Sequence, residues 1–118
     1  MESDTFSLSA LSRAIEGRNS AAMRGFYADD AKMTLVDRDH PPSKPQEIAG
    51  GRAIAAYFDD VCGRTMTHHV EDSCLDANHL AFTQACTYPD GKRVICSAMA
   101  ELKGGKIVKQ TIVQAWDA

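Results

Sequence analysis

The spacing of apolar residues changes near Met66, and this change constrains the fold more than any other feature of the sequence. Before Met66 the apolar residues recur at helical spacing, and after it they alternate with polar residues as far as Trp116. Four strands are therefore predicted, at roughly 66–76, 79–88, 92–102 and 106–116. Their connectors are only a few residues long, so successive strands are expected to pair antiparallel as a meander.

The first half of the chain predicts three helices. The first ends at Gly17, and the second begins at an N-cap, Asn19 or Ser20, and runs through Tyr27. The third covers residues 52–63, where apolar side chains fall on one helical face before a glycine.

The region between the second and third helices completes the predicted plan. Residues 32–37 are typical of a short strand, whereas residues 38–51 contain three prolines and are predicted to be a loop throughout. The fold class is α+β, with three N-terminal helices packed on a sheet made of the short strand and the antiparallel four-strand meander. A chain of 118 residues suits one such domain, so a single domain covering residues 1–118 is predicted.

The charge balance argues against nucleic acid as a partner. Thirteen basic and 16 acidic side chains give a formal net charge of −3, and no basic block is present. The sequence shows neither a signal peptide nor an apolar run of roughly 20 residues. We therefore expect no membrane association and a cytoplasmic location.

The cysteines predict neither a zinc site nor a disulfide framework. They are separated by 12, 12 and 10 positions, at Cys62, Cys74, Cys86 and Cys96. We expect free thiols that act as small buried hydrophobic side chains. His68 and Asp72 share a strand face but lie too far apart to hold one ion, so no metal and no cofactor is expected.

Residues 88–92 predict a hairpin with a three-residue loop, because Pro, Asp and Gly suit a turn that ends in a left-handed glycine. This loop places Cys86 opposite Val94 and Cys96 opposite Gln84. One face then carries Gln84, Cys86, Tyr88, Val94, Cys96, Ala98 and Ala100. Cys86 and Cys96 become diagonal neighbours about 7–8 Å apart, too far for an unstrained disulfide.

Two glutamines share one face of the last predicted strand. That face carries Val108, Gln110, Ile112, Gln114 and Trp116. A buried amide needs hydrogen-bond partners, so the glutamines either bond each other and the backbone or contact a ligand.

His68 and His69 are neighbours in the strand predicted at 66–76, so their side chains point to opposite faces. At most one of them can face a pocket. Imidazole titrates near neutral pH and can both accept and donate a proton, which suits enolisation or dehydration.

Three segments give the sequence a resemblance to a known family. They are residues 25–37 (GFYADDAKMTLVD), 50–61 (GGRAIAAYFDDV) and 104–117 (GGKIVKQTIVQAWD). In this order they resemble the nuclear transport factor 2-like cone fold, and in particular SnoaL-like polyketide cyclases and steroid isomerases. The resemblance implies a curved sheet around a conical pocket that the helices close. It also implies a homodimer formed through the outer sheet face.

The same resemblance implies positions for the chemistry. The positions that match the tyrosine, the base and the acid of the isomerases are Leu11, Leu35 and Ala98. All three are apolar, so we expect that isomerase mechanism to be absent. The segment Thr-His-His-Val is similar to one in dehydratase-like members and implies His69 as a catalytic base, oriented by Asp37 or Asp39. If the alternation is shifted by one residue, His68 takes the inward place instead.

The remaining expected pocket residues are Tyr27, Tyr57, Gln84, Cys86, Cys96, Ala98, Gln110, Gln114 and Trp116. Either tyrosine could donate to a substrate carbonyl. The sequence thus predicts a protein that binds a small apolar or carbonyl-containing molecule. Three functions stay open: acid–base catalysis of the cyclase, dehydratase or isomerase type, ligand binding without catalysis, and a dimeric interaction module.

Overall fold

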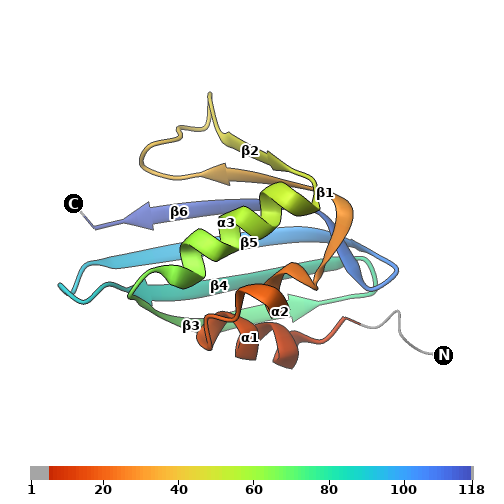
Figure 1. The fold of residues 1–118 in the computed structure, drawn as a ribbon, viewed down its shortest axis with the longest axis horizontal. Helices are drawn as coiled ribbons and strands as arrows, with labels where there is room; N and C mark the ends of the chain where they lie inside the picture. The colour runs from red at the N-terminus through yellow and green to blue at the C-terminus, as the bar shows by residue number, and fades with distance from the viewer. Residues whose placement is uncertain (1–5, 118) are drawn as a thin grey trace.

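In a computed structural model, the residues that the structure describes are 6–117, and they form three helices and six strands (Figure 1). The helices are α1 (Leu8–Glu16), α2 (Ser20–Arg24) and α3 (Gly51–Gly63). The strands are β1 (Tyr27–Val36), β2 (Gln46–Ala49), β3 (Thr67–Leu75), β4 (His79–Thr87), β5 (Arg93–Lys103) and β6 (Lys106–Trp116). No helix in this part of the chain is long and apolar enough to cross a membrane.

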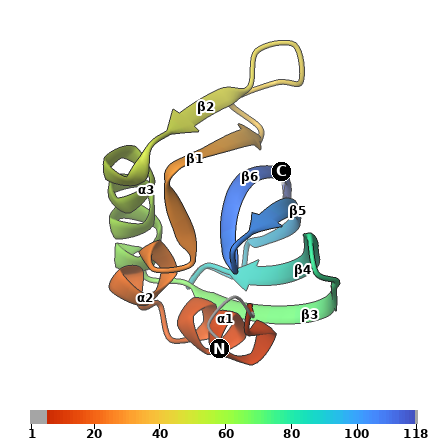
Figure 2. The same ribbon diagram turned by 90° about the vertical axis from the view of Figure 1, so that its right-hand side faces the viewer.

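All six strands belong to one sheet, in the order β2-β1-β6-β5-β4-β3. Figure 2 shows that this sheet is curved and does not close, with the helices gathered on one side of it. The predicted α+β class, with a curved sheet and three helices, is confirmed. The sheet is mixed rather than antiparallel throughout, because β1 runs parallel to β6.

Local sequence explains where the helices begin and end. The Ser7 hydroxyl accepts a hydrogen bond from the Ala10 N–H at 3.1 Å and caps α1. The Asn19 side chain does the same for α2 by accepting from the Ala22 N–H. The third predicted helix is confirmed as α3, which buries Ile54 and Phe58 against the sheet.

Two expectations about the segment before α3 are wrong. Tyr27 opens β1 instead of ending the second helix, because α2 stops at Arg24 and the next residues pair with β6. The expected loop 38–51 contains β2, which pairs antiparallel with β1 and buries Ile48. Both departures arise from pairing with distant strands, which outweighs local propensity.

The predicted register of the β4–β5 hairpin is confirmed. Cys86 lies opposite Val94 and Cys96 opposite Gln84. The turn works because Gly91 takes a φ of 90°, a left-handed conformation that glycine adopts without strain. As expected, all four cysteines are free within residues 6–117, but only Cys86 and Cys96 are buried.

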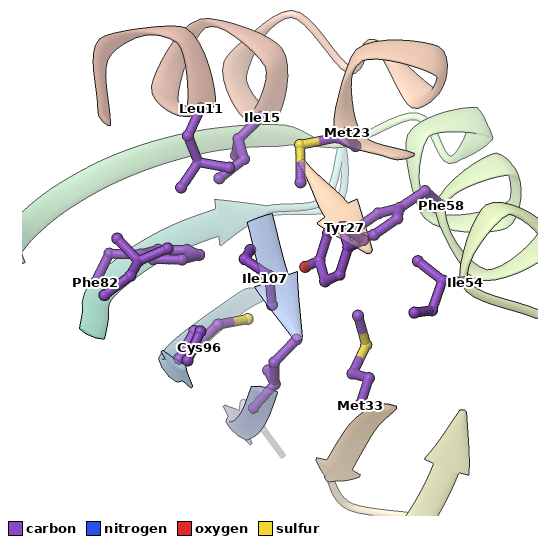
Figure 3. Close-up of a cluster of buried hydrophobic side chains, with 14 of the residues drawn as sticks. Leu11, Ile15, Met23, Tyr27, Met33, Ile54, Phe58, Phe82, Cys96 and Ile107 are labelled. Atoms are coloured by element: carbon purple, nitrogen blue, oxygen red, sulfur yellow. The ribbon is translucent and has the colours of Figure 1, made fainter. Parts of the chain in front are cut away.

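An irregularity in β6 overturns one expected face. The pairing with β5 shifts between Glu101 and Leu102, which face Lys109 and Ile107 respectively. This bulge turns Ile107 fully into the core and leaves Val108 only partly buried. Val108 therefore does not share the inward face of Gln110 as predicted. Figure 3 shows Ile107 inside the cluster of buried side chains.

Candidate functional site

A cavity of about 820 Å³ lies between the concave face of the sheet and α3. It reaches the end of the sheet where β1, β4 and β6 finish (Figure 1). The apolar part of its wall consists of Ile15, Met23, Leu35, Phe58, Val61, Met66, Phe82, Val94 and Ile112. Its volume lies within the range of roughly 300–1,000 Å³ that is typical of sites for small organic molecules.

A buried hydrogen bond crosses the floor of the cavity. The Tyr27 hydroxyl donates to Oε1 of Gln110, whose side chain is only 1% exposed. Tyr27 lies among apolar side chains (Figure 3), and its ring is 5.4 Å from that of Phe58. Burial raises the pKa of Tyr27 above its ordinary value, so the phenol stays protonated and keeps its donor role. Gln110 thus already has a protein partner.

The cavity's outer end carries an Asp–His pair. Nδ1 of His40 lies 2.8 Å from Oδ1 of Asp37, which also accepts the Asp39 N–H at 2.9 Å. Backbone hydrogen bonds in both directions between residues 37 and 40 fix this turn. Both side chains line the cavity, with exposed fractions of 14% for Asp37 and 39% for His40. The carboxylate therefore orients the imidazole and leaves Nε2 for another partner.

Aromatic side chains form the rim beside this pair. Trp116 stacks on Tyr88 with ring centroids 5.8 Å apart, and the guanidinium carbon of Arg38 lies 4.4 Å from the Trp116 ring centroid. The indole N–H donates to Oε1 of Gln114 at 3.1 Å. The rim thus links the turn after β1 to the ends of β4 and β6, and Gln114, like Gln110, has a protein partner.

The two histidines of β3 take opposite faces as predicted, and His68 rather than His69 faces inward. His68 lines the cavity, with Nδ1 3.0 Å from Sγ of Cys86. The His69 side chain is 73% exposed and lies 3.2 Å from a carboxylate oxygen of Glu16. The expectation that His69 points into the pocket is wrong, because His68 is the residue opposite inward-facing Cys86.

The structure brings most of the expected pocket residues to this cavity. Those in its wall are Tyr27, Asp37, Tyr57, Gln84, Cys86, Cys96, Gln110, Gln114 and Trp116. Ala98 is buried in the hydrophobic core instead. The sequence does not indicate His40 and Arg38 as site residues, because the proline-rich segment that follows β1 predicts only a loop. The signal for His40 was its place three residues after Asp37 in a turn, where the carboxylate can reach the ring.

Comparisons with known proteins bear on the fold. Neither a family model nor a curated protein matches the sequence. Among solved structures, one from Mesorhizobium loti, described as an ntf2-like protein of unknown function, is 13% identical with a TM-score of 0.78. The match covers 89% of this chain and 84% of that one. The chain has the nuclear transport factor 2-like fold.

Two further structures with the nuclear transport factor 2-like fold are similar. A candidate ketosteroid isomerase from Kribbella flavida is 16% identical, covers 93% of this chain and 74% of its own, and has a TM-score of 0.74. A Burkholderia xenovorans protein of unknown function is 21% identical, with coverage of 93% and 79% and a TM-score of 0.73. Likeness at this level shows the shared fold, and function has to be argued from the site.

The three apolar residues that the resemblance places at the isomerase positions belong to the buried core. Leu11, Leu35 and Ala98 are all buried, with exposed fractions of 3% or less. None of them offers a proton donor or acceptor, so acid–base chemistry in this cavity has to use other groups.

Proposed function

We propose that the chain binds a small, largely apolar carbonyl compound in the cavity and moves a proton at the carbon beside the carbonyl. The observation that carries this proposal is the Asp37–His40 pair at the cavity's outer end. In this role Nε2 of His40 removes the proton, and the carboxylate of Asp37 stabilises the imidazolium that forms. His40 replaces His69 as the base, whereas Asp37 keeps the orienting role expected from the sequence.

The enolate that forms needs a donor for its oxygen. Tyr57 lines the cavity, and burial raises the pKa of its phenol, so it remains protonated at neutral pH. A neutral hydroxyl in a largely apolar cavity can donate a hydrogen bond to a developing oxyanion. Tyr57 is therefore the proposed donor, and Arg38 adds positive charge at the rim.

Trp116 gives a direct test of binding, because it is the only tryptophan of the chain and lies in the cavity wall. Titration with a panel of cyclic ketones is expected to change its fluorescence. A ketone at 100 times its dissociation constant should also raise the free energy of unfolding by about 2.7 kcal/mol. Gln84→Phe, which fills the cavity, is expected to weaken binding about tenfold or more, a loss of about 1.4 kcal/mol.

Thr87→Phe is the matched control for that titration. It adds the same ring to the same strand, at a position that alternation places on the opposite face. If the two variants bind alike, or if no ketone alters either fluorescence or stability of folded protein, the cavity is not the binding site.

A second proposal concerns the outer face of the sheet. We propose a homodimer through this face, because three large apolar side chains point outward from its central strands. They are Ile95 at 48%, Met99 at 66% and Val113 at 48% exposure. Such a patch on a monomer is typical of an interaction surface.

Met99→Lys is expected to weaken this dimer at least about tenfold, because a charge would be buried without a partner. Light scattering after size-exclusion chromatography over a dilution series measures the effect. Asp90→Lys, in the β4–β5 turn, changes charge without touching the patch and serves as control. A wild-type chain that is monomeric throughout the series contradicts the dimer.

A further inference from the structure

Three reactive side chains other than the Asp37–His40 pair meet in one wall of the cavity. His68, Cys86 and Cys96 come from the adjacent strands β3, β4 and β5, and all three line the cavity. His68 Nδ1 and Cys86 Sγ are 3.0 Å apart, and the Cys86 thiol also lies 3.7 Å from Oε1 of Gln84. These contacts distinguish Cys86 from a cysteine that merely fills apolar space.

The surroundings of the two thiols shift their pKa values in opposite directions. Hydrogen bonding to Cys96 and then to His68 lowers the pKa of Cys86, against the effect of its burial. The bond to Cys86 and burial both raise the pKa of Cys96, so that thiol keeps its proton. The other titratable group that faces the pair is Tyr57 on α3. Of the two thiols, Cys86 is therefore the one that ionises more readily, and the His68 imidazole lies beside it.

The strand register keeps this thiol in its reduced form. Because Cys86 faces Val94 and Cys96 faces Gln84, the two cysteines are diagonal neighbours on adjacent strands. Their Cα atoms are then about 7–8 Å apart, beyond the usual span of a disulfide. Both cysteines are free. Because Cys86 does not form a disulfide with Cys96, its activated thiol can react with a molecule in the cavity.

We propose that Cys86 is a nucleophile that captures α,β-unsaturated carbonyl compounds in the cavity by conjugate addition. In the first half of the step, the thiol proton passes to His68 and Sγ forms a bond to the β-carbon. The carbon–carbon π bond breaks, and its electron pair moves through the α-carbon to the carbonyl oxygen as an enolate. In the second half, the proton held by His68 goes to the α-carbon, which leaves a thioether and a restored ketone.

The position of Cys86 favours this class of compound over a general electrophile. Val94 lies directly opposite Cys86, and Phe82 lies four residues away on the same strand face; both line the cavity, so the carbon skeleton of an enone has apolar contacts along this wall. The inference uses the carbonyl-binding cavity of the proposed function. It does not depend on proton transfer by His40.

The full-length chain and 2-cyclohexen-1-one test the proposal, with intact mass and peptide mapping to locate the adduct. Cys74 is exposed and serves as an internal reference thiol. At pH 6, Cys86 is expected to react about tenfold or more faster than Cys74, because far more of it is thiolate. His68→Asn is expected to slow Cys86 about tenfold at that pH and to move its rate profile to higher pH.

Two substitutions control the experiment. His69→Asn changes the neighbouring, outward-facing imidazole and should leave the labelling rate of Cys86 unaltered. Cys86→Ala should remove the fast adduct, with circular dichroism to verify folding. The proposal is overturned if Cys74 is labelled faster than Cys86. It is also overturned if His68→Asn changes neither the labelling rate of Cys86 nor the pH dependence of that rate.

Cyclohexanone separates this proposal from the proposed function. This saturated ketone cannot form the adduct, so it reports on the cavity alone through Trp116 fluorescence. Cyclohexanone binding with no enone adduct at Cys86 overturns the thiol proposal and leaves the carbonyl site standing. An adduct at Cys86 without ketone proton exchange supports the thiol and overturns the role of His40.

Discussion

Replacing His40 with glutamine is expected to lower the rate of α-proton exchange in a bound ketone about 100- to 10,000-fold, the usual contribution of a general base. The amide has no basic nitrogen, although it can still bond to Asp37. The measurement is deuterium incorporation from heavy water into the ketone, followed by NMR. Binding, read from Trp116 fluorescence, should change much less, because the cavity keeps its apolar wall.

The chain provides a matched control for this substitution. His79 also follows an aspartate by three residues, with its Nδ1 3.2 Å from Oδ1 of Asp76, but its side chain is 63% exposed and does not line the cavity. His79→Gln is therefore expected to leave exchange unaltered. Equal losses in the two variants, or full exchange in His40→Gln, would assign the chemistry to other groups.

Ile107→Ala is expected to lower the free energy of unfolding by about 2–5 kcal/mol, the usual cost of emptying a buried isoleucine site. Ile107 has no exposed surface, and its N–H donates to the Phe26 carbonyl at 2.8 Å, so the surrounding backbone is held in place. Where the surroundings cannot move into the empty space, the cavity remains and the loss of stability is larger. Urea denaturation followed by circular dichroism measures the change.

Val108→Ala distinguishes this result from a general effect of shortening β6. The bulge leaves Val108 partly exposed, so its truncation should cost less than about 1 kcal/mol. Strict alternation along the strand predicts the opposite order, with Val108 inward. A larger loss for Val108→Ala than for Ile107→Ala would therefore contradict the bulge.

The parts of the fold that follow from local signals could be predicted from the sequence. The β4–β5 register depends on the three-residue turn, and Gly91 takes the positive φ that this turn requires. α3 ends at the predicted glycine, because its apolar face and its stop signal are both local. These features need no knowledge of distant contacts.

The first two strands depend on distant contacts and were harder to predict. Residues Tyr27–Val36 become a strand because β6 and β2 pair on either side of them, and no local pattern shows those partners. β2 has only four residues and follows three prolines. Pairing with β1 provides hydrogen-bond partners for the backbone groups of β2, whereas the local sequence predicts a loop.

The candidate site shows the same division. Alternation separates His68 from His69, but it has two equivalent phases, and only the pairing of His68 with Cys86 selects one. That pairing cannot be found by counting residues from the turn between β3 and β4, because a bulge between Val70 and Ser73 shifts the register. The sequence does not single out His40, because its spacing from Asp37 also occurs between Asp76 and His79, and only the fold shows which pair lies at the cavity.

The place of β6 in the sheet has a consequence for how the chain folds. β6 is the most C-terminal of the six strands, yet it lies between β1 and β5 and joins the β2–β1 pair to the β5–β4–β3 meander. On the ribosome, the earlier strands therefore emerge with the facing edges of β1 and β5 unpaired until residues 106–116 leave the exit tunnel. Pairing β1 with β6 also closes a loop of most of the chain, which slows folding. Nascent or truncated chains should thus be the form of this protein that depends most on chaperones.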